Sequence, residues 1–336
     1  MAVCIVLVNY RGHNDTIECL ESILKSSYDR FQVVVVDNSE GEDDILALQQ
    51  WARGDRPAVS TSFDDLVFPL EKKPLSFRTF GQDDLRTLTA PAPEKVLFVK
   101  ASRNNGFASG NNIAIDYASR VKAFEYVWLL NNDTVVQKDT LTCLVTCGAR
   151  QAANVGIIGC KLRQYHNPDR LQAVGALYYK WIGKVRELAA GEVDRGQWDA
   201  QIVNANYVIG ASMFVTKAFI AAVGPMEEDY FIYFEELDWC LRGKEKGFTV
   251  AFCPQAIVFH KLGATTGSQQ KTSEISDFYS IRNRILIARK FFPISLITLY
   301  PAFAMFIVNR LRKGMPERIA LLFRVLMNPR KHYKRA

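Results

Sequence analysis

Three acidic side chains follow a run of aromatic residues in the second half of the chain. The segment Tyr230–Cys240 reads Tyr-Phe-Ile-Tyr-Phe-Glu-Glu-Leu-Asp-Trp-Cys, so Glu235, Glu236 and Asp238 lie within four positions. Aromatic walls with carboxylates at one end suit the binding of a sugar and the removal of a hydroxyl proton. Acids at the start of a helix also complement its dipole, which accounts for one of the three and leaves the other two open.

Asp133 and His260 are typical metal ligands, and each follows an apolar run that predicts a strand. A carboxylate and an imidazole suit Mg²⁺ or Mn²⁺ when phosphate oxygens complete the coordination shell. Asn131 lies two residues before Asp133 and projects to the same side if the strand continues. Taken alone, Asn131-Asn132-Asp133 also fits a turn, and a single histidine at a strand end is more often structural.

Polar residues also follow the first two predicted strands. Asn9–Gly12 comes after the apolar run Val3–Val8, and Asp37–Ser39 comes after Phe31–Val36. Ligands of open α/β sheets gather at the carboxyl ends of the strands. One aspartate at such a position is usually a helix cap. With Asn131–Asp133, however, three predicted strands end in polar residues, and together they favour a binding site.

A loop rich in glycine and asparagine precedes a predicted helix at Asn111–Arg120. Residues 103–112 read Arg-Asn-Asn-Gly-Phe-Ala-Ser-Gly-Asn-Asn. Glycines let backbone amides approach a ligand, and a helix N-terminus favours negative charge. The loop lacks the Lys-Ser/Thr of a P-loop and the glycine spacing of a dinucleotide fingerprint, so neither motif applies.

The order of the elements predicts an α/β fold with a doubly wound, mainly parallel sheet and helices on both faces. We expect the first helix over residues 14–26, capped by Asn14 or Asp15. Residues 54–94 have mixed charges, several prolines and no clean period, and they predict a surface insertion. The predicted strands are residues 3–8, 31–36, 96–100, 126–130, 156–160, 207–215, 249–252 and 256–259.

We expect residues 291–336 to form a separate C-terminal unit after a domain of residues 1–290. Phe291–Val308 carries no charge, but 18 residues is the lower limit for a bilayer span and two prolines interrupt it. Pro316–Met327 predicts an amphipathic helix with basic flanks, which favours attachment in the membrane interface. The alternative is a core helix that packs on the main domain. The predicted apolar face consists of Ile319, Leu322, Phe323 and Leu326.

The net charge of +7 is concentrated at the C-terminus. Nine Lys/Arg and one acid lie from Arg310 onward, a balance of +8, so residues 1–309 carry about −1. A basic tail beside an apolar run favours an anionic membrane surface over nucleic acid. Seven scattered cysteines fit reduced thiols, and no signal peptide precedes the first strand. We therefore expect a cytoplasmic domain, peripheral on the inner face of the cell membrane.

The ordered set of motifs resembles the family 2 glycosyltransferases of GT-A fold over about residues 3–290. Within that family, the chain looks most like bacterial rhamnosyltransferases and their galactofuranosyl relatives. Each motif is moderately specific alone, and the ordered set is highly specific. The segments that carry the resemblance are Val6–Tyr10, Val36–Ser39, Asn105–Asn112, Leu130–Asp133, Gly210–Phe214, Phe234–Asp238, Val258–His260 and Tyr279–Arg284.

The resemblance implies a role for each matching position. Asp37 would bind the nucleobase, and Asp133 with His260 would hold Mg²⁺ or Mn²⁺ against the diphosphate. Glu236 would be the catalytic base, with Asp238 in reserve. The other residues implied at the nucleotide sugar are Asn9, Tyr10, Arg11, Asn105, Gly106, Asn131, Asn132 and Arg282. Those implied at the acceptor are Gly210, Ala211, Glu235 and Trp239.

The resemblance also implies the reaction. One carboxylate base and no second nucleophile fit a single displacement with inversion at the anomeric carbon. The favoured donor is dTDP-rhamnose, with UDP-sugars as the alternative, and the acceptor would be a glycan or a lipid-linked glycan. A homo-oligomer is compatible with the family. Asn131 departs from the family motif, which has an aspartate there, so more of the metal site would rest on Asp133 and His260.

Two other functions compete with this interpretation. A sugar nucleotidyltransferase would need a basic glycine-rich loop after the first strand, where the sequence supplies only Arg11. A non-catalytic carbohydrate-binding or scaffold protein of the same fold would not need Asp37, Asp133, Glu236 and His260 together. Donor hydrolysis or transfer would exclude the scaffold, and pyrophosphate release from a nucleoside triphosphate would identify the nucleotidyltransferase.

Overall fold

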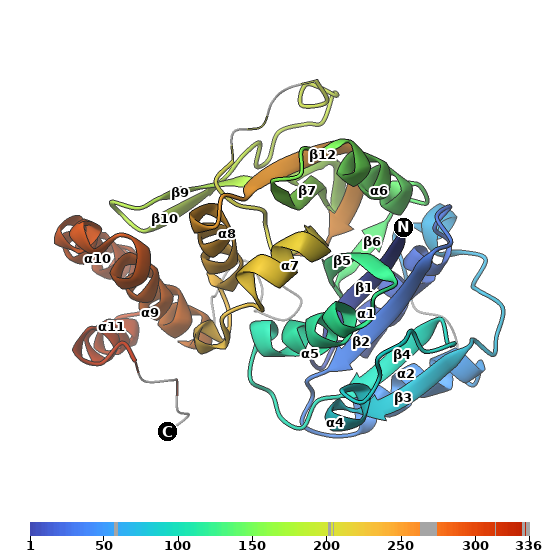
Figure 1. Cartoon of the computed structure of the whole chain (residues 1–336). Coiled ribbons are helices and arrows are strands. Elements are labelled where there is room, and N and C mark those ends of the chain that lie inside the picture. The colour runs from blue at the N-terminus through green and yellow to red at the C-terminus, as the bar shows by residue number, and fades with distance from the viewer. Residues whose placement is uncertain are drawn as a thin grey trace.

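A ten-stranded, mostly parallel sheet runs through the centre of the computed structural model (Figure 1). The structure describes residues 1–56, 60–200, 203, 205–262, 274–312, 314–330 and 333. The sheet strands are β1 (Ala2–Asn9), β2 (Phe31–Asp37), β3 (Phe77–Gly81), β4 (Val96–Lys100), β5 (Phe124–Asn131), β6 (Thr134–Val136), β7 (Val155–Gln164), β8 (Asn167–Ala173), β11 (Ser212–Thr216) and β12 (Thr249–His260). Their order is β3-β4-β2-β1-β5-β11-β7-β12-β6, and β8 pairs with β7.

The strand directions place the ends of β1, β2, β5 and β12 at one edge of the sheet. β1 is parallel to β2 and β5, and β12 is parallel to β7. β11 is antiparallel to both β5 and β7, so β5 and β12 run the same way. The polar residues that close these strands therefore meet at a common edge, as in other open α/β sheets.

Helices cover both faces of the sheet, which explains why its central strands are continuous apolar runs. One layer contains α1 (His13–Leu24), α2 (Asp43–Arg53) and α6 (Thr140–Arg150), and the other contains α5 (Phe107–Arg120), α7 (Lys217–Val223) and α8 (Glu235–Glu245). Each face of the sheet has its own hydrophobic core, and alternate residues of β1 belong to each. Val3 and Ile5 pack toward the first helix layer, and Cys4 and Val6 pack toward the second. The predicted doubly wound α/β class is confirmed.

Three local predictions were wrong. The stretch 54–94 is more than a surface insertion, because it supplies β3, a parallel edge strand of the main sheet, with the short helices α3 (Asp64–Val67) and α4 (Gln82–Leu85). The two strands predicted between 249 and 259 form a single strand, β12, with an irregularity between Cys253 and Ile257. Helix α1 begins after Gly12, so neither Asn14 nor Asp15 is its N-cap residue.

A separate cluster of helices packs beside the sheet at the C-terminal end of the chain (Figure 1). It contains α9 (Glu274–Phe291), α10 (Leu296–Arg312) and α11 (Glu317–Met327). The hairpin of β9 (Ala176–Tyr179) and β10 (Lys184–Glu187) reaches this cluster, and Trp181 in its turn accepts a hydrogen bond from Thr298 of α10 through its carbonyl oxygen.

The face of α11 differs from the predicted one. Leu321, Leu322 and Val325 are buried against α9, as in the core-helix alternative, whereas Phe323 is 56% exposed. The apolar side chains that face outward lie mainly on α10, where Ile297 is 75% exposed. Within the described part of the chain, the segment Pro293–Arg312 is long and apolar enough to cross a membrane, and 22% of it is buried.

Candidate functional site

Three polar side chains from distant parts of the sequence meet at the carboxyl edge of the sheet. Asp133 follows β5, and its Oδ1 lies 3.2 Å from Nε2 of His260, the last residue of β12. Nδ2 of Asn131 lies 3.3 Å from the same imidazole nitrogen. All three positions were predicted for the nucleotide sugar or its metal ion, and the fold brings them together.

The donor atoms of this group are suited to a divalent cation. The Oδ1 atom of Asn131 is buried and has no hydrogen-bond partner. Burial alone would raise the pKa of Asp133, but the neighbouring His260 and Lys261 outweigh burial and lower it. Among the described residues no group of three or more His, Cys, Asp or Glu side chains could hold an ion by itself. A cation here would therefore take Asp133, His260 and an amide oxygen, and diphosphate oxygens would complete its shell.

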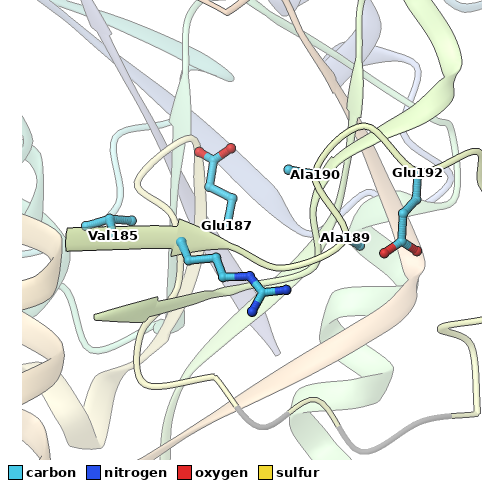
Figure 2. Close-up of a pocket in the computed structure, with 6 residues that line it drawn as sticks. Val185, Glu187, Ala189, Ala190 and Glu192 are labelled. Carbon is cyan, nitrogen blue, oxygen red and sulfur yellow. The ribbon is translucent and has the colours of Figure 1, made fainter. Parts of the chain in front are cut away.

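The ring nitrogen of His260 that faces away from Asp133 contacts a residue that the sequence analysis did not predict. This nitrogen, Nδ1, lies 2.8 Å from Oε1 of Gln172 on β8. Burial raises the pKa of the nearby Glu187, although Gln172 and His260 act to lower it. Figure 2 shows Glu187 on its hairpin beside a pocket of about 530 Å³. These residues lie outside every strand and motif that the sequence analysis predicted.

The acids of the aromatic segment start helix α8, and two of them each have one carboxylate oxygen without a hydrogen-bond partner. The Oε2 atoms of Glu235 and Glu236 are buried and accept no hydrogen bond. Burial raises the pKa of Glu236 to about 7. Burial and the neighbouring Glu236 raise the pKa of Glu235 well above its usual range. A Cβ added at Gly210 would lie 3.8 Å from Cδ of Glu236, so this glycine leaves space beside the carboxylate.

The turn that presents these acids has an unusual backbone. Phe231, Tyr233 and Phe234 have φ values of 63°, 68° and 74°, in the left-handed region that costs most residues free energy. Asn283 of α9 holds the turn, because its Nδ2 lies 2.8–2.9 Å from the carbonyl oxygens of Tyr230, Ile232 and Tyr233. The Asn of the Arg282-Asn283 pair therefore shapes the site without entering it.

The glycine-rich loop packs directly on the same turn. The backbone N–H of Phe107 donates to the carbonyl oxygen of Phe231 at 2.8 Å. Gly106 has a φ of 95°, and a Cβ there would lie 2.1 Å from that oxygen, so only glycine fits. Two motifs that are more than 120 residues apart thus form one wall, and Asn105 is partly exposed beside it.

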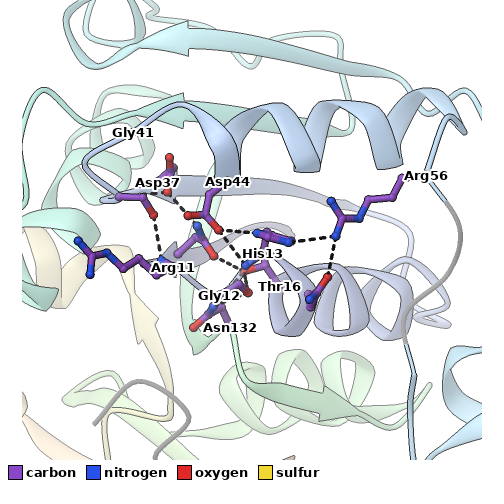
Figure 3. Close-up of polar contacts among 12 residues, drawn as sticks. Arg11, Gly12, His13, Thr16, Asp37, Gly41, Asp44, Arg56 and Asn132 are labelled. Carbon is purple, nitrogen blue, oxygen red and sulfur yellow. Dashed lines mark hydrogen bonds and ion pairs between the residues drawn. The ribbon is translucent and has the colours of Figure 1, made fainter. Parts of the chain in front are cut away.

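The predicted nucleotide residues form a satisfied polar network at the ends of β1 and β2 (Figure 3). Nδ2 of Asn9 donates to Oδ1 of Asp37 at 2.8 Å, and the hydroxyl of Thr16 donates to Oδ1 of Asn9 at 2.8 Å. The Nζ of Lys100 donates to the other oxygen of Asp37 at 2.8 Å. Lys100 was not predicted, although it ends the strand next to β2 and its position at the same sheet edge could have identified it.

The neighbouring predicted residues surround this network. Nδ2 of Asn132 donates to the Thr16 hydroxyl at 2.9 Å. Arg11 is exposed, pairs with Glu40 at 2.6 Å and lies over the ring of Tyr10. These contacts bring the first strand end and the Asn-Asn-Asp motif to one side of the sheet.

Two predicted site residues point away from the edge. Asp238 is fully buried and binds Tyr230, Arg242 and Lys290 at 2.6–3.0 Å. Trp239 is also fully buried, because it follows on the inner face of α8 and its Nε1 donates to the carbonyl oxygen of Gly224. These contacts leave neither side chain available to a substrate.

Arg282 and Ala211 support the site from within the fold. The buried guanidinium of Arg282 donates to the carbonyl oxygen and to Oδ1 of Asp229, at 2.6 and 2.7 Å, and so holds the segment before the aromatic turn. Ala211 is buried, and its carbonyl oxygen accepts from the N–H of Asn131 at 3.0 Å. We expected Arg282 to contact the nucleotide sugar and Ala211 to contact the acceptor. In the structure, both residues instead support the neighbouring backbone.

The chain is similar in sequence to two characterised transferases. It is 21% identical over 298 residues to the low-salt glycan biosynthesis hexosyltransferase Agl10 of Haloferax volcanii, covering 87% of this chain and 77% of the relative. It is 25% identical over 205 residues to the dTDP-rhamnosyl transferase RfbF of Shigella flexneri, covering 59% of this chain and 64% of the relative.

Solved structures show the same fold at low sequence identity. The mannosyltransferase PcManGT of Pyrobaculum calidifontis, in complex with GDP-Man and Mn²⁺, matches with a TM-score of 0.52 and 13% identity over 98% of this chain and 88% of its own. GalNAc-T7 with UDP, GalNAc and Mn²⁺ matches with a TM-score of 0.58 and 11% identity over 97% and 57%. The model of the glycosyltransferase-like family 2 matches residues 79–283. The chain therefore belongs to this family and is a glycosyltransferase of the GT-A type.

Proposed function

We propose that the chain transfers rhamnose from dTDP-rhamnose to a hydroxyl of a glycan or lipid-linked glycan, with inversion at the anomeric carbon. The observation that carries the proposal is the meeting of Asp133 and His260 at the sheet edge, across 127 positions of sequence. It is on this edge that a nucleoside diphosphate of an open α/β sheet would lie.

Asp133 and His260 would hold Mg²⁺ or Mn²⁺, with Asn131 contributing its free amide oxygen. The ion supplies Lewis-acid stabilisation of the charge that develops on the leaving diphosphate. Asn9 and Asp37 would line the base and ribose. Because Lys100 already pairs with Asp37, this cluster is preorganised before the donor arrives.

Glu236 is the residue best suited to be the base. Its carboxylate accepts the proton of the acceptor hydroxyl as that oxygen bonds to the anomeric carbon and the bond from this carbon to the diphosphate oxygen breaks. A pKa of about 7 lets it be ionised near neutral pH and still take up a proton. Asp238 is a poor alternative because three side chains already bind it.

The donor assignment rests on the ordered set of sequence motifs and on similarity to the RfbF rhamnosyl transferase at 25% identity. A UDP-sugar is the second candidate, since GalNAc-T7, a protein of the same fold, binds UDP. The acceptor would approach Glu236 past Gly210, where the missing side chain leaves room.

The C-terminal helices would place the enzyme on the cytoplasmic face of the membrane. Ile297 and Met305 of α10 are 75% and 70% exposed, and Arg312 ends the helix with positive charge. An apolar face with basic flanks suits binding at an anionic lipid surface. Residues 1–290 would then form the catalytic domain and residues 291–336 the attachment.

A donor screen tests this function. Purified protein is incubated with Mn²⁺, a lipid-linked acceptor extract and either dTDP-rhamnose, a UDP-sugar or a nucleoside triphosphate. We expect release of dTDP and a rhamnosylated product. Release of UDP alone would move the donor to the UDP-sugars, and pyrophosphate from the triphosphate would indicate a nucleotidyltransferase. Binding of the donor without any turnover would favour the scaffold function.

A further inference from the structure

Arg284 of helix α9 is a mostly buried cation without a partner. Its Nε is buried and has no hydrogen-bond partner, and its guanidinium forms no ion pair with any residue that the structure describes. The nearby carboxylate of Asp277 is bound by Arg310 instead. Charged side chains are rarely buried unless they are paired, because the loss of hydration is costly. The position of Arg284 therefore favours an anionic ligand.

The hairpin of β9 and β10 packs over this arginine. A Cβ added at Gly183 in the hairpin turn would lie 3.4 Å from Cδ of Arg284 and 2.7 Å from Cδ1 of Leu299 on α10. The carbonyl oxygen of Trp181 accepts the hydrogen bond from Thr298 that was described above. Figure 1 shows the hairpin reaching the helical cluster at this point. Arg284 thus lies where the hairpin, α9 and α10 meet.

The hairpin adds positive charge to this junction. Residues 176–186 contain no acid and three cations, which are Lys180, Lys184 and Arg186. The first acid is Glu187, at the end of β10. A local excess of positive charge attracts phosphate groups, and a guanidinium can bind two phosphate oxygens at once.

The same junction borders the apolar surface that we assign to the membrane. Trp181 and Ile182 in the hairpin turn are exposed, as is Ile297 on the neighbouring helix α10. Tryptophan is common at the boundary between lipid and water, where lipid phosphates also lie. A phosphate bound at Arg284 could therefore have its lipid chain on this apolar surface.

The other end of the hairpin lies beside the proposed catalytic base. Tyr178 of β9 packs on Phe234 with 6.1 Å between the ring centroids, and Phe234 directly precedes Glu235 and Glu236. The hydroxyl of Tyr178 is buried and has no hydrogen-bond partner. Burial raises the pKa of Tyr178 to about 12, so the hydroxyl keeps its proton and can donate it to a ligand. The hairpin thus connects an unpaired cation to the turn that presents the base.

We propose that Arg284 binds a phosphate of a lipid-linked acceptor, between the membrane-facing surface and the catalytic base. The inference rests on the proposed sugar transfer and narrows its acceptor from glycans in general to sugars linked to a lipid through phosphate. Arg284 would hold the phosphate while the attached sugar extends along the hairpin toward Glu236. Lysine would be a poorer substitute, since it lacks the planar pair of donors.

Binding of farnesyl diphosphate to the full chain, measured by titration calorimetry in detergent, tests this site. We expect the parent protein to bind it at least about 10-fold more tightly than farnesol, which lacks the phosphates. Arg284→Gln should weaken binding of the diphosphate by about 10–100-fold, the range for hydrogen bonds between charged groups. Arg284→Lys should lose less, because it keeps the charge. Arg289→Gln, which removes an exposed arginine of the same helix, is the matched control and should bind like the parent.

Two other sources of phosphate are tested separately. Vesicles of phosphatidylglycerol report binding of ordinary lipid headgroups, and dTDP with Mn²⁺ reports binding of the donor. We expect Arg284→Gln to bind both as the parent does. A loss of vesicle binding as large as that for farnesyl diphosphate would make Arg284 a general headgroup contact. An equal loss of dTDP binding would assign it to the donor, and either result would overturn the proposal.

Urea unfolding separates binding from a structural role. Loss of an unpaired buried charge should leave the free energy of unfolding of Arg284→Gln unchanged or raise it. If the parent does not prefer farnesyl diphosphate to farnesol, or if Arg284→Gln binds it equally well, Arg284 is only a solvated cation and the inference is wrong.

The outcomes also separate this inference from the proposed function. Rhamnose transfer that is equally fast to acceptors with and without a lipid phosphate would overturn the inference and leave the proposed function intact. Binding of farnesyl diphosphate that depends on Arg284, without transfer from any sugar nucleotide, would support the phosphate site and overturn the proposed function.

Discussion

The two ends of the site differ in how their polar groups are satisfied. At the ends of β1 and β2, Asp37 receives hydrogen bonds from Asn9, Lys100 and the N–H of Ser39. At the start of α8, Glu235 and Glu236 each have a buried carboxylate oxygen with no partner. A satisfied network is stable and holds its shape, whereas an unsatisfied acid is costly and reactive. The difference separates residues that shape the pocket from residues that react in it.

Removing the unsatisfied acid should have the largest effect on the reaction. We expect Glu236→Gln to lower kcat by about 10²–10⁴-fold while donor binding is retained, because the amide cannot take the acceptor proton. The free energy of unfolding should stay the same or rise, since a costly buried acid is lost. Single-turnover transfer and urea unfolding measure the two effects. Turnover at the parent rate would show that another group is the base.

Removing a satisfied acid should instead act on stability. Asp238→Ala leaves the side chains of Tyr230, Arg242 and Lys290 without their shared carboxylate. Loss of one partner from a buried ion pair costs about 3–5 kcal/mol, which urea unfolding would detect. Asp238→Asn is the milder control. A variant that keeps the parent stability but loses transfer would contradict the structural role and return Asp238 to the chemistry.

The metal group lies between these extremes, since Asp133 is paired and Asn131 has a free oxygen. In the parent protein, dTDP with Mn²⁺ at about 100 times its Kd should stabilise the fold by about 2.7 kcal/mol. We expect most of that stabilisation to be lost in Asp133→Ala, as measured by thermal shift. The exposed Asp83→Ala serves as the matched control. Equal stabilisation of the Asp133 variant would count against a metal role.

The smallest predicted effect is that of pH. Because burial raises the pKa of Glu236 to about 7, about a tenth of the enzyme has an ionised base at pH 6, and kcat/KM should rise about tenfold to a plateau above pH 8. Stability should change in the opposite sense. The folded state retains a proton that an ordinary glutamate has released, so the contribution of Glu236 falls as pH rises from about 4.5 to 7. Glu236→Gln should remove that slope, and a flat activity profile would contradict the assignment.

The sequence predicted the fold class and the strand-end motifs because those depend on local pattern. The apolar runs before Asn9, Asp37 and Asp133 are buried on both faces, so their ends were identifiable. Two kinds of information were missing. Trp239 lies in a motif that predicted a site residue, but its position on helix α8 places its side chain in the core. Gln172 reaches His260 only through sheet pairing, which no local pattern contains.

Strand β3 is a second feature that the local sequence pattern did not predict. Phe77–Gly81 lies among charges and prolines and has no alternating pattern, yet it adds a parallel edge strand because β4 offers an unpaired side. Pairing with an existing strand can override a weak local preference.

The irregularity in β12 makes the position of His260 sensitive to the number of residues that precede it in the strand. Cys253 pairs with Cys160 and Ile257 pairs with Lys161, so three extra residues are absorbed between them. Side chains of a strand alternate between the two faces of the sheet. The number of unpaired residues in the irregularity therefore affects the face on which His260 lies. If the three-residue irregularity is kept, deleting a single residue from 254–256 shifts the pairing of residues 257–260 by one position and turns the imidazole toward the opposite helix layer. Such a deletion would abolish the site while every chemical group named above remained in the chain.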